Sequence, residues 1–273
     1  MRPASNITTM TMTMIMTIDP KSSSIGSLAF ALFALTATSV AAVQPHDLDP
    51  DAIASGRFGY VTVLQIGDTS MEIESVREIR IDAVDGAPRL LITTTSSTGM
   101  GETVDRLQLD AETLYPLARE IVQGLGRMTL DYDSERVTGL IQSVGESIRV
   151  DLNLEQPAYA GDAGLDTLLA ALPLAVGLNG TLAVVETDVD AHVQQFRFSV
   201  AEPETISVPA GTFSTWPVRV QAQDDPDYQQ TLWLTVELPR VFVQAEAPVP
   251  QEAGGGTLVT RLTETGNVTP ESP

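Results

Sequence analysis

The feature that most constrains this chain is the alternation of apolar and polar residues along short segments bounded by turn-forming residues. Between Met71 and Ile81, apolar side chains recur at every second position for most of the length. A period of two places one face of a β-strand in a core and the other face in water. Dipeptides such as Asp85-Gly86 supply turns between these segments. The pattern therefore predicts strands joined by tight turns and not a parallel α/β sheet.

The complete pattern predicts an all-β, mainly antiparallel fold: a curved meander sheet that forms a half-barrel or barrel, with one or two short helices. Leu165–Leu172 is the first predicted helix, because Pro173 stops it. Tyr115–Val122 is the second, with Pro116 at an early position. Thr181–Val200 is predicted as one long or bent strand, or as two strands. The other predicted strands are 60–64, 71–81, 89–95, 105–109, 127–132, 136–143, 147–154, 205–208, 215–222, 228–238, 241–245 and 257–263.

The first 42 residues have the order of a secretory signal peptide. Lys21 is followed by the mostly apolar run 25–35, and the small residues 39–42 resemble a cleavage site. The apolar run is shorter than the ~20 residues that span a bilayer. We therefore expect a Sec-type signal peptide over residues 1–42 and a periplasmic or secreted protein without an integral membrane span. The start of translation stays open, because Met10, Met12, Met14 and Met16 precede the apolar run.

The rest of the chain is predicted as a flexible leader (43–56), a single β-rich domain (57–264) and a disordered tail (265–273). The chain contains no cysteine. An exported protein of this kind has no disulfides, so its stability must come from core packing. The lack of cysteine also excludes a lipid-modified cysteine, so we do not expect a lipoprotein.

The charge of the chain excludes two classes of partner. The formal net charge is -21, and Lys21 is the sole lysine. Nucleic acids and anionic membranes both need clustered positive charge, so neither is an expected partner. The acidity itself has three interpretations: a GC-rich genome with a soluble acidic surface, adaptation to high salt, or the use of calcium.

The sequence contains no recognisable catalytic motif, so we expect a non-enzymatic protein without a cofactor. A Gly-x-Ser-x-Gly nucleophile motif and glycine-rich phosphate loops are both missing. Asp188, Asp190 and His192 follow Glu186 at every second position and would share one face of a strand. Side chains two apart on a strand are roughly 6.5–7 Å apart, so a metal would need a further ligand from another strand. A solvated strand face is the simpler interpretation of these residues.

A set of large apolar residues has two open interpretations. They line a cavity for an acyl chain or another apolar ligand, or they fill an ordinary core. These ligand-lining candidates are Leu169, Leu172, Phe196, Phe198, Phe213, Trp216, Trp233 and Phe242.

The C-terminal half resembles a known family. The segment 208–220 reads VPAGTFSTWPVRV and is followed by a strand that carries Trp233 and by the segment PRVFVQ at 239–244. Together with the steps 114–116 and 171–174, this resembles the exported, β-rich domain-of-unknown-function family 3108 over roughly residues 106–262. The resemblance implies a curved β-sheet domain in the cell envelope. It implies no catalytic residues, because the family has none established.

Together these observations favour an exported periplasmic protein that binds a hydrophobic ligand or an envelope partner in a curved β-sheet. Two alternatives stay open. One is a metal-dependent or carboxylate-dependent hydrolase, which would need acids from another strand to converge on His192. The other is a structural or interaction protein of the cell envelope.

Overall fold

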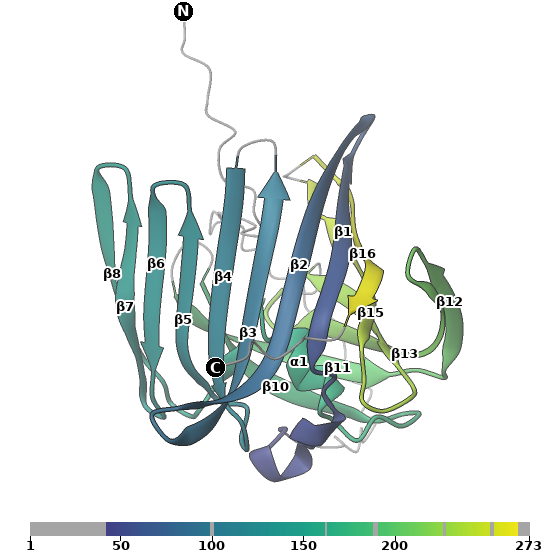
Figure 1. The fold of residues 1–273 in the computed structure, drawn as a ribbon, viewed down its shortest axis with the longest axis horizontal. Coiled ribbons are helices and arrows are strands. Elements are labelled where there is room, and N and C mark those ends of the chain that lie inside the picture. Colours follow the sequence, from purple (N-terminus) through teal and green to yellow (C-terminus); the bar gives the residue numbers. More distant parts are fainter. Residues whose placement is uncertain are drawn as a thin grey trace, which may run out of the picture.

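One large open sheet dominates the fold (Figure 1). The computed structural model describes residues 42–98, 101–161, 163–187, 191–225, 228–251 and 254–266. Within these residues, a 16-stranded sheet and one short helix form, so the prediction of a mainly antiparallel all-β fold is confirmed. The strands are β1 Gly56–Ile66, β2 Thr69–Val84, β3 Ala87–Thr98, β4 Gly101–Asp110, β5 Pro116–Gln123, β6 Gly126–Tyr132, β7 Arg136–Ser143, β8 Glu146–Asn153, β9 Tyr159–Ala160, β10 Asn179–Glu186, β11 His192–Val200, β12 Glu204–Val208, β13 Gly211–Ala222, β14 Gln229–Thr235, β15 Phe242–Val249 and β16 Gly256–Gly266.

The strand order shows how the chain builds this sheet. The order is β8-β7-β6-β5-β4-β3-β2-β1-β16-β15-β14-β13-β11-β10-β9, and β12 pairs with β13. Strands β1 to β8 therefore form an unbroken meander, as expected where short turns join antiparallel strands. The last strand, β16, pairs with β1 and joins the two halves of the sheet. The two ends of the order, β8 and β9, do not pair with each other, so the sheet is open.

The alternation in the sequence matches the burial of the strands. On β2, Arg77 and Ile79 are buried, whereas Glu78 and Arg80 are exposed. The strand register places buried side chains next to one another across the sheet. Ile79 lies opposite Ile92 on β3, and Ile92 lies opposite Leu107 on β4. These side chains belong to one core on the concave side of the sheet.

The first predicted helix is confirmed as α1, Leu165–Ala170. All six of its residues are buried, and Leu168 and Leu169 lie in the same core cluster as Ile92 and Leu234. The helix therefore fills part of the concave side of the sheet. Ala171 ends it before Pro173, which cannot continue a helix.

The second predicted helix is wrong, because residues 116–123 form β5. This segment pairs with β4 on one side and β6 on the other. Pro116 is the first residue of the strand, where a missing N–H costs little. Arg119 and Ile121 then alternate onto the concave face, opposite Leu107 and Asp105. Pairing on both sides therefore outweighs the weak local helix signal.

The segment Thr181–Val200 forms two strands, one of the two predicted alternatives. Strand β10 presents Leu182 and Val184 to the main core, and Ala183 and Val185 to a second cluster. That second cluster also includes residues of β6, β7 and β8, among them the fully buried Val137. A strand buried on both faces reads as a nearly continuous apolar run, which explains why the segment looked like one strand.

The structure describes the predicted leader and the first two residues of the predicted tail. The predicted leader contains two 3-10 turns, Pro45–Asp47 and Pro50–Ala52, and Ala52, Ile53 and Ala54 are buried. The expected tail begins at residue 265, but β16 continues to Gly266. Residues 1–41 and 267–273 lie outside the described residues, so the signal peptide and the rest of the tail stay predictions.

Candidate functional site

Arg77 attaches α1 to the concave face of β2. Its Nη1 donates to Asp166 Oδ2 at 2.7 Å, and its Nη2 donates to the Ala163 carbonyl at 2.7 Å and to Thr167 Oγ1 at 2.9 Å. Both charged side chains are buried. A buried charge is tolerated only when it is paired and hydrogen-bonded, so this pair fixes the position of α1 at the cost of desolvation.

Arg240 holds the other end of α1. Its Nη1 donates to the carbonyls of Ala170 and Leu172 at 2.7 and 2.9 Å. These carbonyls lie at the C-terminal end of the helix, where backbone acceptors lack helical partners and positive charge is favourable. Burial lowers the pKa of Arg240, and the Asp49 carboxylate opposes this shift. Arg240 lies in the segment 239–244 that supports the family resemblance, and its role here is structural.

A small cavity lies beside α1. It is lined mainly by core side chains, among them Tyr60 and Phe242, together with Asp166 and Arg240, and its volume is about 10 Å³. That volume fits about one water molecule, whereas small-molecule sites measure roughly 300–1,000 Å³. This cavity is therefore too small for an acyl chain.

Four of the predicted ligand-lining residues lie deep in the main core. Leu169, Leu172, Phe196 and Phe198 have exposed fractions of 0 %, 2 %, 1 % and 4 %. Phe196 also contacts the ring of Tyr228, with ring centroids 5.5 Å apart. In this structure these side chains pack against other core residues.

The other four predicted residues are half-buried and do not share one surface. Phe242 stacks obliquely near Tyr60, with ring centroids 5.3 Å apart. Phe213 and Trp216 pack at the margin of the main core. Trp233 alternates with the buried Leu232 and Leu234, so it lies on the opposite face of β14, where its Nε1 donates to Glu204 Oε1. The structure therefore does not bring the eight residues into one cavity, and their ligand role stays a prediction.

The two ends of the predicted metal row, Glu186 and His192, lie on different strands, β10 and β11. Asp188 and Asp190 fall outside the described residues, between the end of β10 and the start of β11. Glu186 and His192, at either end of the predicted row, are cross-strand partners. Within the described part of the chain, no group of three or more metal-ligating side chains converges. The metal and hydrolase interpretations therefore stay untested predictions.

A buried polar cluster beside this connection was missed by sequence reasoning. Arg119 is 4 % exposed and makes a bidentate pair with Asp105, through Nε–Oδ1 at 3.2 Å and Nη2–Oδ2 at 2.8 Å. Its Nη1 also donates to Thr187 Oγ1 at 3.2 Å. The cluster ties β4 and β5 to the end of β10. Its residues are far apart in sequence, so only the register of the strands reveals it.

A second feature missed by sequence reasoning is a half-buried apolar surface, here called the concave patch. It consists of Leu64, Met71, Ile73, Ala247 and Leu258. Leu64 lies opposite both Met71 and Leu258, and Leu258 lies opposite Ala247, so the side chains are neighbours on one face. By alternation this is the face that also carries Tyr60. The β1–β2 hairpin that carries most of the patch extends to the top of the molecule in Figure 1, above α1.

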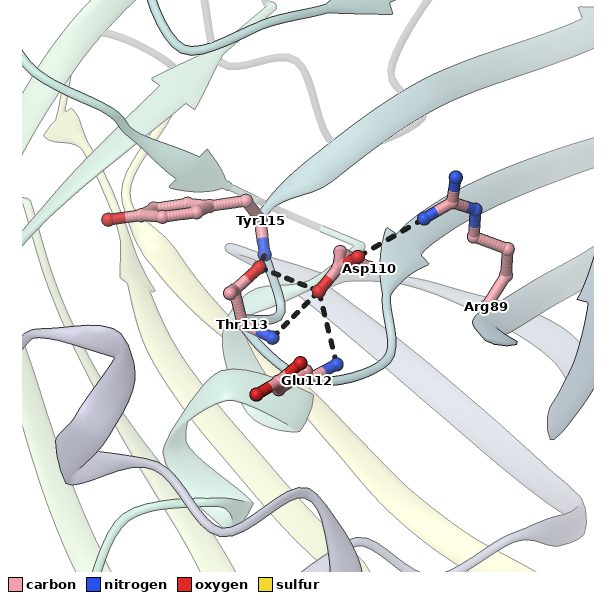
Figure 2. A network of polar contacts seen from close by, with 5 residues as sticks. All are labelled: Arg89, Asp110, Glu112, Thr113 and Tyr115. Atoms are coloured by element: carbon pink, nitrogen blue, oxygen red, sulfur yellow. Dashed lines mark hydrogen bonds and ion pairs between the residues drawn. The ribbon is translucent and has the colours of Figure 1, made fainter. Parts of the chain in front are cut away.

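The Leu114-Tyr115-Pro116 step belongs to a tight corner between β4 and β5. Figure 2 shows the polar contacts of this corner around Asp110. Asp110 Oδ1 accepts hydrogen bonds from the backbone N–H groups of Glu112 and Thr113 at 3.1 and 2.9 Å and from Thr113 Oγ1 at 2.9 Å. Its Oδ2 accepts from Arg89 at 3.1 Å. Partial burial raises the pKa of Asp110, but these hydrogen bonds and the Arg89 charge outweigh it and lower the pKa overall.

This corner places side chains in the core. Leu114 adopts a positive φ of 58° and is 2 % exposed. Tyr115 stacks on Tyr159, with ring centroids 4.9 Å apart and planes at 24°. The corner is thus a structural landmark and presents no reactive group.

Comparison with known proteins identifies the family of this chain. The family model described as "Protein of unknown function (DUF3108)" matches residues 56–256, which span β1 to the first residue of β16. The chain belongs to the DUF3108 family. The resemblance predicted from residues 208–220 and the other landmarks is thereby confirmed. No curated protein matches the chain.

Two solved structures resemble this DUF3108 protein weakly. A candidate exported protein with a YmcC-like fold from Bacteroides fragilis NCTC 9343 is 10 % identical, with a TM-score of 0.36, and the match covers 79 % of this chain and 97 % of that chain. A candidate lipoprotein from Parabacteroides distasonis ATCC 8503 is 9 % identical, with a TM-score of 0.28, and the match covers 80 % and 98 %. Among the described residues, no helix is both long enough and apolar enough to cross a membrane.

Proposed function

We propose that this DUF3108 protein is an exported, non-catalytic binding protein of the cell envelope that holds an apolar chain against the concave patch. The observation that carries the proposal is the continuation of the core face into partly buried apolar side chains near the β1–β2 hairpin, at the end of β1 and the start of β2 and β16. The apolar run at residues 25–35 and the preceding Lys21 support export.

The chemistry of the patch indicates which part of a ligand it contacts. Leu64, Met71 and Leu258 offer apolar area, and covering such area is favourable by about 25 cal/mol per Å². The neighbouring hydroxyls of Thr62 and Thr260 lie 2.9 Å apart and hydrogen-bond each other. The patch itself contains no charged side chain, so an acyl or other hydrocarbon chain, and not an ionic head group, is the expected ligand moiety.

The test is a titration of the purified protein with the neutral fluorescent probe N-phenyl-1-naphthylamine. A Met71→Glu variant places a charge in the patch and is expected to weaken probe binding by about tenfold, because it removes roughly one buried side chain of contact. Leu125→Glu is the matched control, because Leu125 is an exposed apolar residue at 84 % exposure on a hairpin tip. The Leu125→Glu variant is expected to bind the probe with the same affinity as the unmodified protein.

Two results would overturn ligand binding at this patch. The first is no probe binding by the unmodified protein. The second is equal affinity for the Met71→Glu and unmodified proteins. Native mass spectrometry of protein purified from its host supplies the complementary measurement. A lipid-sized added mass supports the proposal, whereas a stable protein partner with no lipid supports the envelope-interaction alternative.

A further inference from the structure

Strand β8 leaves one edge of the sheet open. It is the outermost strand at the left of Figure 1, and among the described residues it pairs with β7 alone. Ser147, Arg149, Asp151 and Asn153 are all exposed along it. An edge strand with unpaired backbone groups is a template for another strand. The β7–β8 pairing has no register shift and β8 has no proline, so two common protections of an edge are missing.

The register of β7 and β8 determines which backbone groups point outward. The Leu154 N–H donates to the Glu135 carbonyl at 2.7 Å and continues the β7–β8 register. Residues of an antiparallel strand alternate between bonding to one side and bonding to the other. Even-numbered residues of β8 therefore bond to β7, and Arg149 and Asp151 direct their N–H and C=O groups away from the sheet.

We propose that a second copy of this chain pairs with this edge, β8 against β8 in antiparallel orientation about a two-fold axis at Val150. In this register Arg149 of each copy lies opposite Asp151 of the partner subunit, and Ile148 lies opposite Leu152 of the partner subunit. Moving the axis by one residue places Arg149 opposite itself, or Asp151 opposite itself. Like charges directly opposite each other are unfavourable, so the sequence of β8 selects the axis at Val150.

Both faces of the joined sheets suit this arrangement. On the convex face, Asp151 already accepts hydrogen bonds from Arg136 at 2.7 and 2.6 Å. The hydrogen bonds from Arg136 lower the pKa of Asp151 most, so the carboxylate is ionised and ready for a second arginine. On the concave face, Ile148 is 48 % exposed and Leu152 is half-buried. Pairing would cover both and extend the second core cluster across the axis.

This inference is independent of ligand binding at the concave patch, because β8 lies at the far end of the meander from β1 and β16. It commits to a second copy because the charges of β8 are complementary to themselves in one register. Pairing with the second copy would form about eight backbone hydrogen bonds, two for each opposed pair of outward-facing residues.

The first experiment is sedimentation velocity on a charge-swap pair at about 1–100 μM, the range in which weak association is visible. The unmodified protein is expected to dimerise. Arg149→Asp and Asp151→Arg are each expected to be monomeric, because every opposed pair would carry like charges. A mixture of the two variants is expected to form a heterodimer, because each Asp then faces an Arg. Arg80→Asp is the control, because Arg80 pairs with Asp82 on interior strand β2 with the same spacing and should leave the dimer intact.

The second experiment tests the axis itself. The chain has no cysteine, so any intermolecular disulfide must come from an introduced residue. Residues opposite each other in a non-hydrogen-bonded pair have Cα atoms about 4.5 Å apart, which suits a disulfide. Val150→Cys is therefore expected to cross-link on mild oxidation. Ile148→Cys is the control, because its equivalents would be roughly 13 Å apart.

Three results would overturn the proposal. They are a monomeric unmodified protein over the whole concentration range, a dimer that persists in Arg149→Asp, and a charge-swap mixture that stays monomeric. Arg149→Pro removes an outward N–H without touching the β7 ladder, and loss of the dimer in this variant is expected. Circular dichroism of each variant shows whether the fold is intact.

Discussion

At the scale of single residues, Arg77 and Asp166 place two opposite charges in the core. Asp166→Ala leaves a buried guanidinium without its carboxylate, and we expect the free energy of unfolding to fall by about 3 kcal/mol. The double replacement Arg77→Met with Asp166→Leu removes both charges and is expected to be close to the unmodified protein. Urea denaturation of the single and double variants measures the difference. Equal losses in both variants would contradict the assigned role of the buried charge.

Asp110 makes stability depend on pH at the corner between β4 and β5. Its pKa is lowered in the folded protein, so its contribution is present above the unfolded pKa of about 3.9 and is lost as the pH falls through the folded pKa. Asp110→Asn is expected to cost about 1 kcal/mol at pH 7 and progressively less as the pH falls below the unfolded pKa of about 3.9. Thermal unfolding of the Asp110→Asn and unmodified proteins between pH 7 and about pH 2 measures this difference in stability. A cost that does not change with pH would show that the carboxylate charge is not responsible.

At the scale of elements, β7 depends on a close approach of two backbones at Gly139. A Cβ at this position would lie 2.0 Å from the Thr129 carbonyl oxygen of β6 and 2.8 Å from Leu130 Cδ2. Gly139→Ala is therefore expected to destabilise the protein by about 1–3 kcal/mol through strain between the strands. At Gly126 on β6 the nearest atom is 3.2 Å away, so Gly126→Ala is the milder matched control. Denaturant midpoints of the two variants compare them, and equal midpoints would contradict the close approach.

The meander also shows which elements follow from local sequence. Alternation identified β2 directly, because Arg77 and Ile79 face the core while their neighbours face water. The same reasoning failed at β5, where a proline and a short apolar stretch resembled a helix start. Strand β5 exists because β4 and β6 pair with it on both sides, and those pairings are not visible in its own residues.

At the scale of the whole molecule, the net charge of -21 predicts that salt stabilises the fold. Self-repulsion among carboxylates opposes the compact state, and salt screens it over a Debye length of about 10 Å at 0.1 M. The melting temperature is expected to rise between low salt and about 1 M NaCl. A further rise with calcium at constant ionic strength would favour the calcium interpretation of the acidity. An unchanged melting temperature in both conditions would contradict the importance of self-repulsion.

The sequence by itself determined the fold class, because burial of one strand face makes apolar residues recur at every second position. It also determined α1, because Pro173 limits where that helix ends, and it identified the family through landmarks such as residues 208–220. The tertiary structure decided which faces meet. The Arg119–Asp105 pair, the concave patch and the open edge at β8 all depend on register between strands distant in the chain. Local periodicity reports whether a residue is buried, whereas only long-range pairing decides what buries it.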